Sequence, residues 1–257
     1  MRPTLPVGAS GRDTGCVTSV NGDGPLQPKE PARTMSRNTA PSEFPAARQA
    51  IIQAALTSFS QHGINGVSLR SIVSAAGQQN QSAIHYHFGN KPGLVSAVLS
   101  YVSGLLADDM SSSIAEFRSR PVAEWTPATL TELICRPFIL LDNQGGDGRL
   151  AIKFMSRLTW QEGGHGQALL VEAVQPYFSQ FIPALAYLNP SKPVDMLTFQ
   201  FYLAVNTLIH GLADSSLLTQ SPARGVEKIR SQKPDQMIRY FVAYISGGLF
   251  SEVVESS

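Results

Sequence analysis

The segment Val67–Lys91, VSLRSIVSAAGQQNQSAIHYHFGNK, carries the clearest pattern of apolar and polar positions in the chain. Apolar side chains recur there at i, i+3, i+4 and i+7, on one face of a helix; they are Leu69, Ile72, Val73 and Ala76. Ser68 is a good N-cap, because its hydroxyl can accept a backbone N–H of the first turn. Gly77 stands where a residue with positive φ commonly ends a helix. The pattern predicts a short helix between Ser68 and Gly77.

A second short helix is predicted over Gln81–His87, after a polar turn. Ile84 and Phe88 are four residues apart and point inward, while the other faces carry small or hydrogen-bonding groups. Asn90 is then expected to cap a third helix. Two short helices around a turn, the second one polar, are typical of the helix-turn-helix that enters a DNA major groove.

The remaining apolar positions predict helices on both sides of this segment. The expected helices are Pro45–His62, Asn90–Ser119, Pro127–Asn143, Arg149–Gln161, Gln167–Leu188, Pro193–Leu217 and Pro234–Val253. Loops are expected at Gly145–Gly148, Gly163–Gly166 and Thr219–Lys233. Pro176 and Pro183 each remove a backbone donor, so we expect them to kink or interrupt their helix. No segment alternates with a period of two, and the chain is therefore predicted to be all-α.

Val67–Lys91, together with the amphipathic helix before it, resembles the DNA-binding domain of the TetR family of transcriptional regulators. The match is carried by Ser68-Leu69-Arg70-x-Ile72, Ala75-Ala76-Gly77 and Tyr86-His87-Phe88-Gly89-Asn90-Lys91. The stretch from Gly77 to Phe88 is one residue longer than is usual in the family. The first residue of the recognition helix is therefore open among Gln79, Asn80 and Gln81.

The resemblance implies a three-helix DNA-binding domain over residues 43–91 and a larger helical domain over residues 92–257 that binds a ligand and dimerises. In TetR-like proteins the last two helices pair with their twofold mates as a four-helix bundle. A dimer places two recognition helices about 34–36 Å apart, as a palindromic operator in double-stranded DNA requires. The alternative is that the two apolar helices Pro193–Leu217 and Pro234–Val253 are buried in the core of a monomer.

A set of polar or small residues is predicted to face DNA: Ser68, Arg70, Asn80, Gln81, Ser82, Ala83, His85, Tyr86, His87 and Lys91. By resemblance, Lys91 occupies the phosphate-contacting lysine position of the family, and Ser68 and Arg70 would also hold the phosphate backbone. His85 and His87 occupy positions that touch the backbone or nearby bases. Gln81, Ser82 and Ala83 fall where base edges are read, since glutamine can pair with adenine and an alanine methyl can meet a thymine methyl.

A metal site is the alternative for His85 and His87. Residues at i and i+2 of a helix point to different faces, and no third ligand lies near them in the sequence. We therefore predict no metal. The two cysteines, Cys16 and Cys135, form no zinc or disulfide framework, and no apolar run approaches the roughly 20 residues of a membrane span. The sequence predicts a cytoplasmic protein that needs no cofactor and has no membrane partner.

Charge is informative through its distribution, because the net charge is only +1. Between Phe44 and Ala107 there is no Asp or Glu, as suits a surface that lies against phosphates. Residues 1–42 are rich in Gly, Pro, Ser, Thr and Asn and are expected to be disordered, since they cannot bury enough apolar surface to fold. This tail is either a basic arm that touches DNA or an over-long start, with Met35 as the initiator.

Aromatic and polar side chains recur at helical spacing in the later helices, and core packing alone accounts for most of them. Asn206 and His210 lie at i, i+4 in an otherwise apolar helix, where they are costly unless they are hydrogen-bonded. Ligand sites are mainly apolar with a few polar groups. The predicted ligand-binding residues are Phe154, Leu158, Tyr177, Phe201, Tyr202, Asn206 and His210. A satisfied core histidine is the alternative for His210.

The segments Leu150–Trp160 and Gln167–Tyr187 also look similar to TetR-like regulators that respond to fatty-acid or acyl-CoA-type effectors. The resemblance implies a repressor that a small hydrophobic effector releases from DNA. The alternative is an all-α enzyme or binding protein that acts on a hydrophobic small molecule. An enzyme would need a nucleophile beside a base, or a carboxylate pair in a cleft. The later helices offer His165 and His210 with three acidic residues in no recognisable spacing, so no catalytic residue is predicted.

Overall fold

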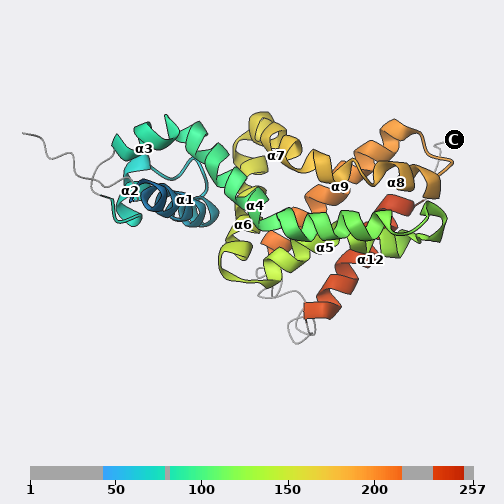
Figure 1. Ribbon diagram of the computed structural model, residues 1–257. Coiled ribbons are helices and arrows are strands. Elements are labelled where there is room, and N and C mark those ends of the chain that lie inside the picture. The colour runs from blue at the N-terminus through green and yellow to red at the C-terminus, as the bar shows by residue number, and fades with distance from the viewer. Residues whose placement is uncertain (1–42, 79–81, 216–233, 252–257) are drawn as a thin grey trace, which may run out of the picture. The chain divides into compact units, whose positions relative to one another are not determined.

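The computed structural model describes residues 43–78, 82–215 and 234–251 of the 257-residue chain. These residues form α-helices and one short 3-10 helix, with no β-strand among them (Figure 1). The elements are α1 (Glu43–His62), α2 (Leu69–Ala75), α3 (Ser82–Phe88), α4 (Lys91–Arg118), η1 (Val122–Glu124), α5 (Pro127–Asn143), α6 (Gly146–Gln161), α7 (Gly163–Phe178), α8 (Ile182–Leu188), α9 (Val194–Ala213) and α12 (Pro234–Phe250). The predicted all-α fold is confirmed for this part of the chain. The predictions for residues 1–42 and 219–233 fall outside it.

The predicted helix Gln167–Leu188 is interrupted, because α7 ends at Phe178 and α8 starts at Ile182. Pro183 lies in the first turn of α8, where its missing N–H leaves no helical hydrogen bond unmade. In a continuous helix the same proline would leave the carbonyl of Ser179 without its donor. Pro176 lies inside α7 without ending it. We expected the two prolines either to kink or to interrupt the helix, and the chain shows an interruption before Pro183.

The predictions that Gly145–Gly148 and Gly163–Gly166 are loops between helices are wrong, because a helix begins within each segment. α6 begins at Gly146, before the predicted Arg149, and α7 begins at Gly163, directly after α6. A Cβ on Gly166 would overlap the carbonyl oxygen of Leu158, so glycine allows the start of α7 to approach the end of α6. The apolar pattern could not reveal this, because the close approach of two backbones is a tertiary contact.

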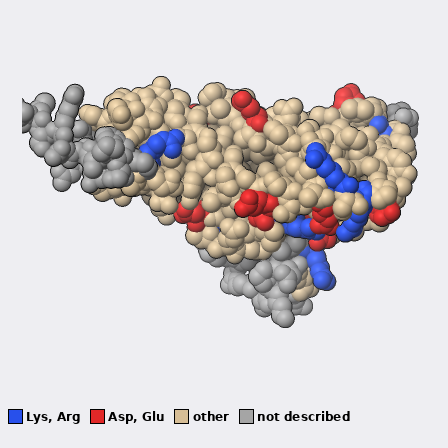
Figure 2. Space-filling view, viewed as in Figure 1, with Lys and Arg blue, Asp and Glu red and all other residues tan. Residues whose placement is uncertain are grey.

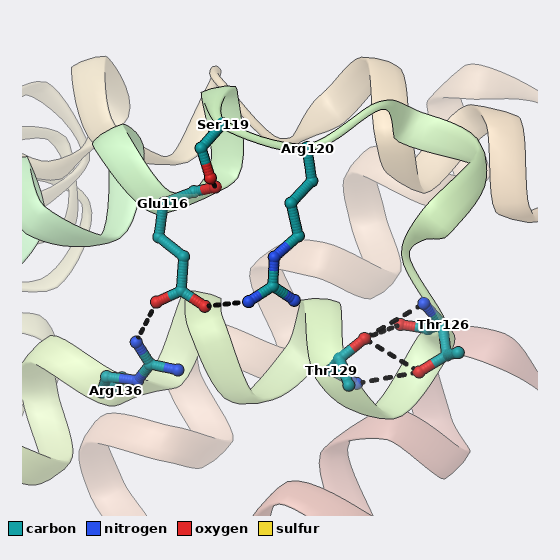
Figure 3. A network of polar contacts seen from close by, with 6 residues as sticks. All are labelled: Glu116, Ser119, Arg120, Thr126, Thr129 and Arg136. Carbon is teal, nitrogen blue, oxygen red and sulfur yellow. Dashed lines mark hydrogen bonds and ion pairs between the residues drawn. The ribbon is translucent and has the colours of Figure 1, made fainter.

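Polar contacts at both helix ends fix the corner between α4 and α5 (Figure 3). The carboxylate of Glu116 accepts a hydrogen bond from Arg120 at 3.1 Å and another from Arg136 of α5. Thr126 and Thr129 form a capping box at the start of α5, in which each hydroxyl accepts the other residue's backbone N–H. The ion pairs are partly exposed, so each stabilises by at most about 1 kcal/mol. Their main effect is to set where α5 starts against α4.

α6 is the central element of the packing and contacts α1, α4, α5, α7 and α9. The hydroxyl of Ser60 in α1 donates to the carbonyl of Leu150 in α6 at 2.7 Å. The hydroxyl of Tyr101 in α4 donates to the carboxylate of Asp147 in α6, also at 2.7 Å. α1 and α4 are therefore held to the later helices by direct contact with α6, and not only by the connecting chain.

Two helices, α4 and α9, are long and apolar enough to cross a membrane by length and composition. Both also contribute fully or nearly fully buried side chains to the core, including Leu94 and Val98 of α4 and Leu208 and Ile209 of α9. The core helix of a soluble protein passes the same test, so these helices do not by themselves indicate a membrane protein.

Candidate functional site

The two short helices predicted from the apolar pattern are present as α2 and α3. α2 begins after Ser68, whose hydroxyl accepts the N–H of Ser71 at 3.1 Å, as expected of an N-cap. The chain leaves α2 through Gly77 at φ +68°, a conformation that glycine adopts without strain. Ile72 of α2 and Ile84 of α3 are buried in the core. The local sequence therefore accounts for both helices.

α3 buries one side chain in the core and exposes others on its outer face. Ile84 is 1% exposed, whereas Tyr86 is 75% exposed. Among the residues predicted to face DNA, the exposed ones are Ser68, Arg70, Ser82, His85 and Tyr86, and the half-buried ones are Ala83, His87 and Lys91. Asn80 and Gln81 lie outside the described residues. The structure thus gathers the described members of the predicted set on the surface of α2, α3 and the start of α4.

Two of these side chains also bind the local backbone. Nδ1 of His85 lies 2.9 Å from the carbonyl oxygen of Gly89. Because a carbonyl only accepts, Nδ1 carries the proton in this contact. Nζ of Lys91 donates to the carbonyl of Val67 at 2.7 Å, and an ammonium has further donors to offer. These contacts hold a histidine ring and a positive charge in place beside α2 and α3.

Arg48 of α1 belongs to the same surface, although the sequence did not assign it there. Its guanidinium carbon lies 5.4 Å from the centre of the Phe88 ring, next to α3. Burial, and then the positive charge of Arg48, lower the pKa of His87 below its ordinary value. His87 is therefore a neutral hydrogen-bonding group near pH 7. The sequence signal for Arg48 was the absence of acidic residues around it.

Charge separates this surface from the rest of the molecule. In the view of Figure 2, Lys and Arg side chains but no Asp or Glu side chains are seen over α2 and α3, whereas side chains of both charges are seen over the later helices. The sequence explains the difference, because no Asp or Glu occurs between Phe44 and Ala107. Phosphate groups could approach such a surface without meeting a carboxylate.

A cavity of about 210 Å³ lies among α7, α8 and α9, with one side chain from α6. We call it the apolar cavity; it is lined by Thr159, Gln167, Leu170, Val171, Val174, Gln175, Phe178, Ser179, Ile182, Thr198, Phe201, Tyr202, Val205 and Asn206. Phe201, Tyr202 and Asn206 are predicted ligand-binding residues that the structure brings together here. The amide of Asn206 donates to the carbonyl of Tyr202 at 3.0 Å, which leaves its oxygen as an acceptor.

Three other predicted ligand-binding residues, Phe154, Leu158 and Tyr177, are buried in the core and do not line the apolar cavity. The hydroxyl of Tyr177 donates to the carbonyls of Leu133 and Ile134 at 3.0 and 3.2 Å, and burial raises its pKa. A helical period of apolar residues describes core packing and cavity lining equally well. The sequence pattern therefore could not separate the two.

Sequence reasoning missed the side of the apolar cavity that α7 and α8 supply. Leu170, Val171, Val174 and Phe178 repeat at intervals of one to four residues, which has the form of an ordinary core stripe. Ile182 follows after the break between the two helices. A void appears only where facing side chains fail to meet, and no one-dimensional signal reports that.

His210, the last predicted ligand-binding residue, joins α6 to α9. Its Nδ1 lies 2.8 Å from the hydroxyl of Ser156, and its Nε2 lies 3.2 Å from the hydroxyl of Thr159. Burial lowers the pKa of His210, against a smaller opposing effect of Asp214. The ring is thus half-buried and hydrogen-bonded through both nitrogens. It contacts the apolar cavity only through Thr159.

No group of three or more His, Cys, Asp or Glu side chains within residues 43–78, 82–215 and 234–251 is placed to hold a metal ion. Ser156 and His210 have the spacing of a hydroxyl and its base. The second ring nitrogen binds Thr159, however, and not a carboxylate that would orient the ring for catalysis.

Two family models match this chain. A model described as "Bacterial regulatory proteins, tetR family" matches residues 51–98, and one described as "Tetracyclin repressor-like, C-terminal domain" matches residues 132–248. The HTH-type transcriptional dual regulator CecR of Shigella flexneri is 35% identical over 116 residues. That match covers 43% of this chain and 50% of CecR, so the chain spans about half the length of this relative.

Solved structures share the fold. FadR from Bacillus subtilis, crystallised with stearoyl-CoA, has a TM-score of 0.53 at 17% identity, over 78% of this chain and 98% of FadR. AibR, crystallised with isovaleryl coenzyme A and operator DNA, has a TM-score of 0.52 at 17% identity, over 79% of this chain and 98% of AibR. At this identity the likeness establishes the fold alone.

Proposed function

This chain belongs to the TetR family of bacterial regulatory proteins, and we propose that it is a homodimeric transcriptional regulator that binds a palindromic operator in double-stranded DNA. It acts as a cytoplasmic repressor that a small hydrophobic effector releases from DNA. Residues 43–91 form its DNA-binding domain, and residues 92–257 form its effector-binding and dimerisation domain.

The exposed polar face of α3 is the observation that carries the proposal. Tyr86, His85 and Arg70 are all exposed, on a part of the chain that contains no carboxylate. Phosphate contacts supply most of the affinity for DNA, and polar side chains on a helix in the major groove read the bases. Arg70 and Lys91 are the phosphate-binding groups in this proposal, and Ser82, Ala83 and the two histidines face the bases or the adjacent backbone.

Dimerisation is supported by the outer faces of α9 and α12. Phe199 and Leu203 of α9 are 64% and 51% exposed, and Tyr244 of α12 is 72% exposed. Large apolar side chains gathered on neighbouring helices usually mark an interaction surface. The two helices pack against each other, so a second copy could add its own pair to make a four-helix bundle.

The apolar cavity is the proposed effector site. Its volume of about 210 Å³ is below the range of about 300–1,000 Å³ that is usual for drug-sized ligands, so the effector places a small apolar group there. FadR and AibR were crystallised with acyl thioesters of coenzyme A, which supports an acyl group as the effector's apolar part. Phe201 and Tyr202 would contact this group, and Asn206 would fix a polar atom.

α6 connects the effector site to the DNA-binding helices in this mechanism. Thr159 lines the apolar cavity, and two residues later the side-chain oxygen of Gln161 accepts the N–H of Ile64, just beyond α1, at 2.7 Å. A ligand that displaces Thr159 would therefore disturb the support of α1. The effector can shift the DNA-binding equilibrium only as far as it binds the two states differently.

A mobility-shift assay with the DNA upstream of the protein's own gene tests the proposal. The double variant R70A/Y86A changes two exposed side chains without touching the core, and we expect about tenfold or greater weakening of DNA binding. The matched variant R118A changes an exposed arginine at the far end of α4 and should bind as the unaltered protein does. Equal retardation by both variants, each folded by circular dichroism, would reject the DNA-binding assignment.

The effector arm of the same assay uses isovaleryl coenzyme A and stearoyl coenzyme A as probes. Release of DNA by one of them is expected, and V171F, which fills part of the apolar cavity, should abolish release but not DNA binding. Release that V171F leaves unchanged would place the effector elsewhere. Turnover of either thioester by the purified protein would instead favour the enzyme alternative.

A further inference from the structure

A second cavity, of about 630 Å³, lies where α1, α6 and α9 meet. We call it the polar cavity. Gln61 of α1 lines one side, Lys153, Arg157 and Trp160 of α6 line another, and His210 and Asp214 come from α9 and the residue after it. Its volume lies within the range of about 300–1,000 Å³ that is usual for small-molecule sites. It is therefore large enough for a whole ligand, unlike the apolar cavity.

The charged groups of the polar cavity favour an anion. Lys153 and Arg157 are four residues apart on α6, so their positive charges lie close together on one helix face, an arrangement that costs stability without a counter-ion. Within the described residues neither side chain takes part in an ion pair. The positive charge of Lys153 favours the ionised form of Asp142, but Asp142 does not line the cavity. Asp214 is the acidic group in the lining. Two cations face one carboxylate, and burial favours the neutral form of His210.

An exposed tryptophan stands beside these cations. Trp160 is 80% exposed, and its ring lies nearly perpendicular to the His210 ring at a centroid distance of 6.4 Å and an interplanar angle of 73°. Because so much of the side chain is exposed, an indole face is left for a planar ligand. Stacking of a heterocyclic base on an aromatic side chain stabilises many nucleic-acid complexes and tolerates any base, because every base has a flat π-face.

We propose that the polar cavity binds a small phosphorylated ligand that carries an aromatic ring, such as a nucleotide. Lys153 and Arg157 hold the phosphate groups, and the ring stacks on Trp160. The site is separate from the apolar cavity, and Thr159 in the wall of that cavity is hydrogen-bonded to His210 and Ser156 of the polar cavity. Because Ser60 and Gln61 line the polar cavity, the ligand contacts both α1 and α6. It would stiffen the junction that holds the DNA-binding helices.

Fluorescence of the full-length protein tests this site, because the chain contains two tryptophans and Trp125 is only 3% exposed. Titration with adenosine 5′-diphosphate should quench the Trp160 emission with saturation. Adenosine lacks the phosphates and inorganic pyrophosphate lacks the ring, so each should bind at least about tenfold more weakly, as the loss of charge-assisted bonds or of stacking requires.

Variants sharpen the test. K153Q/R157Q should weaken binding of adenosine 5′-diphosphate by about tenfold or more, while the matched pair R118Q/R239Q, which removes two exposed arginines elsewhere, should leave it unchanged. D214N removes the opposing charge and should tighten binding. V171F, which fills the apolar cavity, should have no effect, so failure of the effector proposal and failure of this one are distinguishable.

Several outcomes would overturn the proposal. One is the absence of saturable quenching by adenosine 5′-diphosphate up to millimolar concentration. A second is equal affinity of K153Q/R157Q and the unaltered protein. A third is a Trp160 emission that is already blue-shifted and insensitive to iodide, because that would place Trp160 under a second copy of the chain.

Discussion

α3 and α9 expose opposite kinds of side chain. α3 is a short helix that buries Ile84 and exposes Tyr86 and His85. α9 buries side chains along its whole length and still exposes Phe199 and Leu203. A polar outer face fits a hydrated, charged partner, and an apolar outer face fits another protein surface that excludes water. The kind of partner that a helix binds is therefore indicated by the side chains that it still exposes once its core-facing residues are buried.

The largest effect is expected from substitutions on the apolar outer face of α9. F199E/L203E places two carboxylates on the outer face of α9, and the proposed dimer should dissociate at micromolar concentration. The expected loss is about 3–6 kcal/mol, because the two protomers together remove four roughly half-exposed apolar side chains from the interface. Sedimentation velocity measures the change.

Y86E is the matched variant on α3 and should keep the oligomeric state while it weakens DNA binding. A monomer in the unaltered protein, or a dimer that persists in F199E/L203E, would contradict the proposed role of α9.

A smaller effect on stability is expected to distinguish the buried side of α3 from its exposed side. I84A removes a side chain that is 1% exposed and should lower the free energy of unfolding by about 3 kcal/mol, because the lost burial adds to the cavity left behind. Y86A, whose side chain is 75% exposed, should change it by less than about 0.5 kcal/mol. Urea denaturation followed by circular dichroism compares the two. Similar losses in both variants would mean that α3 does not dock through Ile84.

The smallest expected effect concerns the pH dependence contributed by α9. The pKa of His210 is lowered in the folded protein, so the unfolded chain binds the proton more tightly. The stability that comes from neutral His210 is fully present above its ordinary pKa of about 6.5, and it is lost as the pH falls through the lowered value. The Tm of the unaltered protein should therefore drop more between pH 7.5 and pH 5 than that of H210Q. Equal drops would mean that His210 is not held neutral between Ser156 and Thr159.

The helix-turn-helix segment was the part of the fold most open to prediction, because its signals are local. The N-cap at Ser68, the positive φ of Gly77 and the inward side chain of Ile84 each depend on neighbours within one turn. The same holds for the cap at Asn90, whose side chain accepts the N–H of Gly93 at 2.9 Å. Helix caps of this kind persist in the folded protein because both partners lie within one turn of the chain.

The candidate ligand site was predicted only in part. Phe201, Tyr202 and Asn206 line the apolar cavity, while Phe154, Leu158 and Tyr177 have the same helical spacing and fill the core. The two sets of side chains have different surroundings because different helices face them. The sequence carries no record of that facing surface, and so it did not single out the α7 residues that line the cavity.

The sequence by itself determined the all-α class, the helix-turn-helix and the acid-free surface around it, because caps, period and charge are properties of neighbouring residues. Tertiary structure alone decided that Gly163 and Gly166 start a helix, that Thr159 and Gln161 join a cavity to α1, and that Lys153, Arg157 and Trp160 meet in a second cavity. Each of these depends on backbones and side chains far apart in the chain. Their close approach is set by packing, which no local pattern encodes.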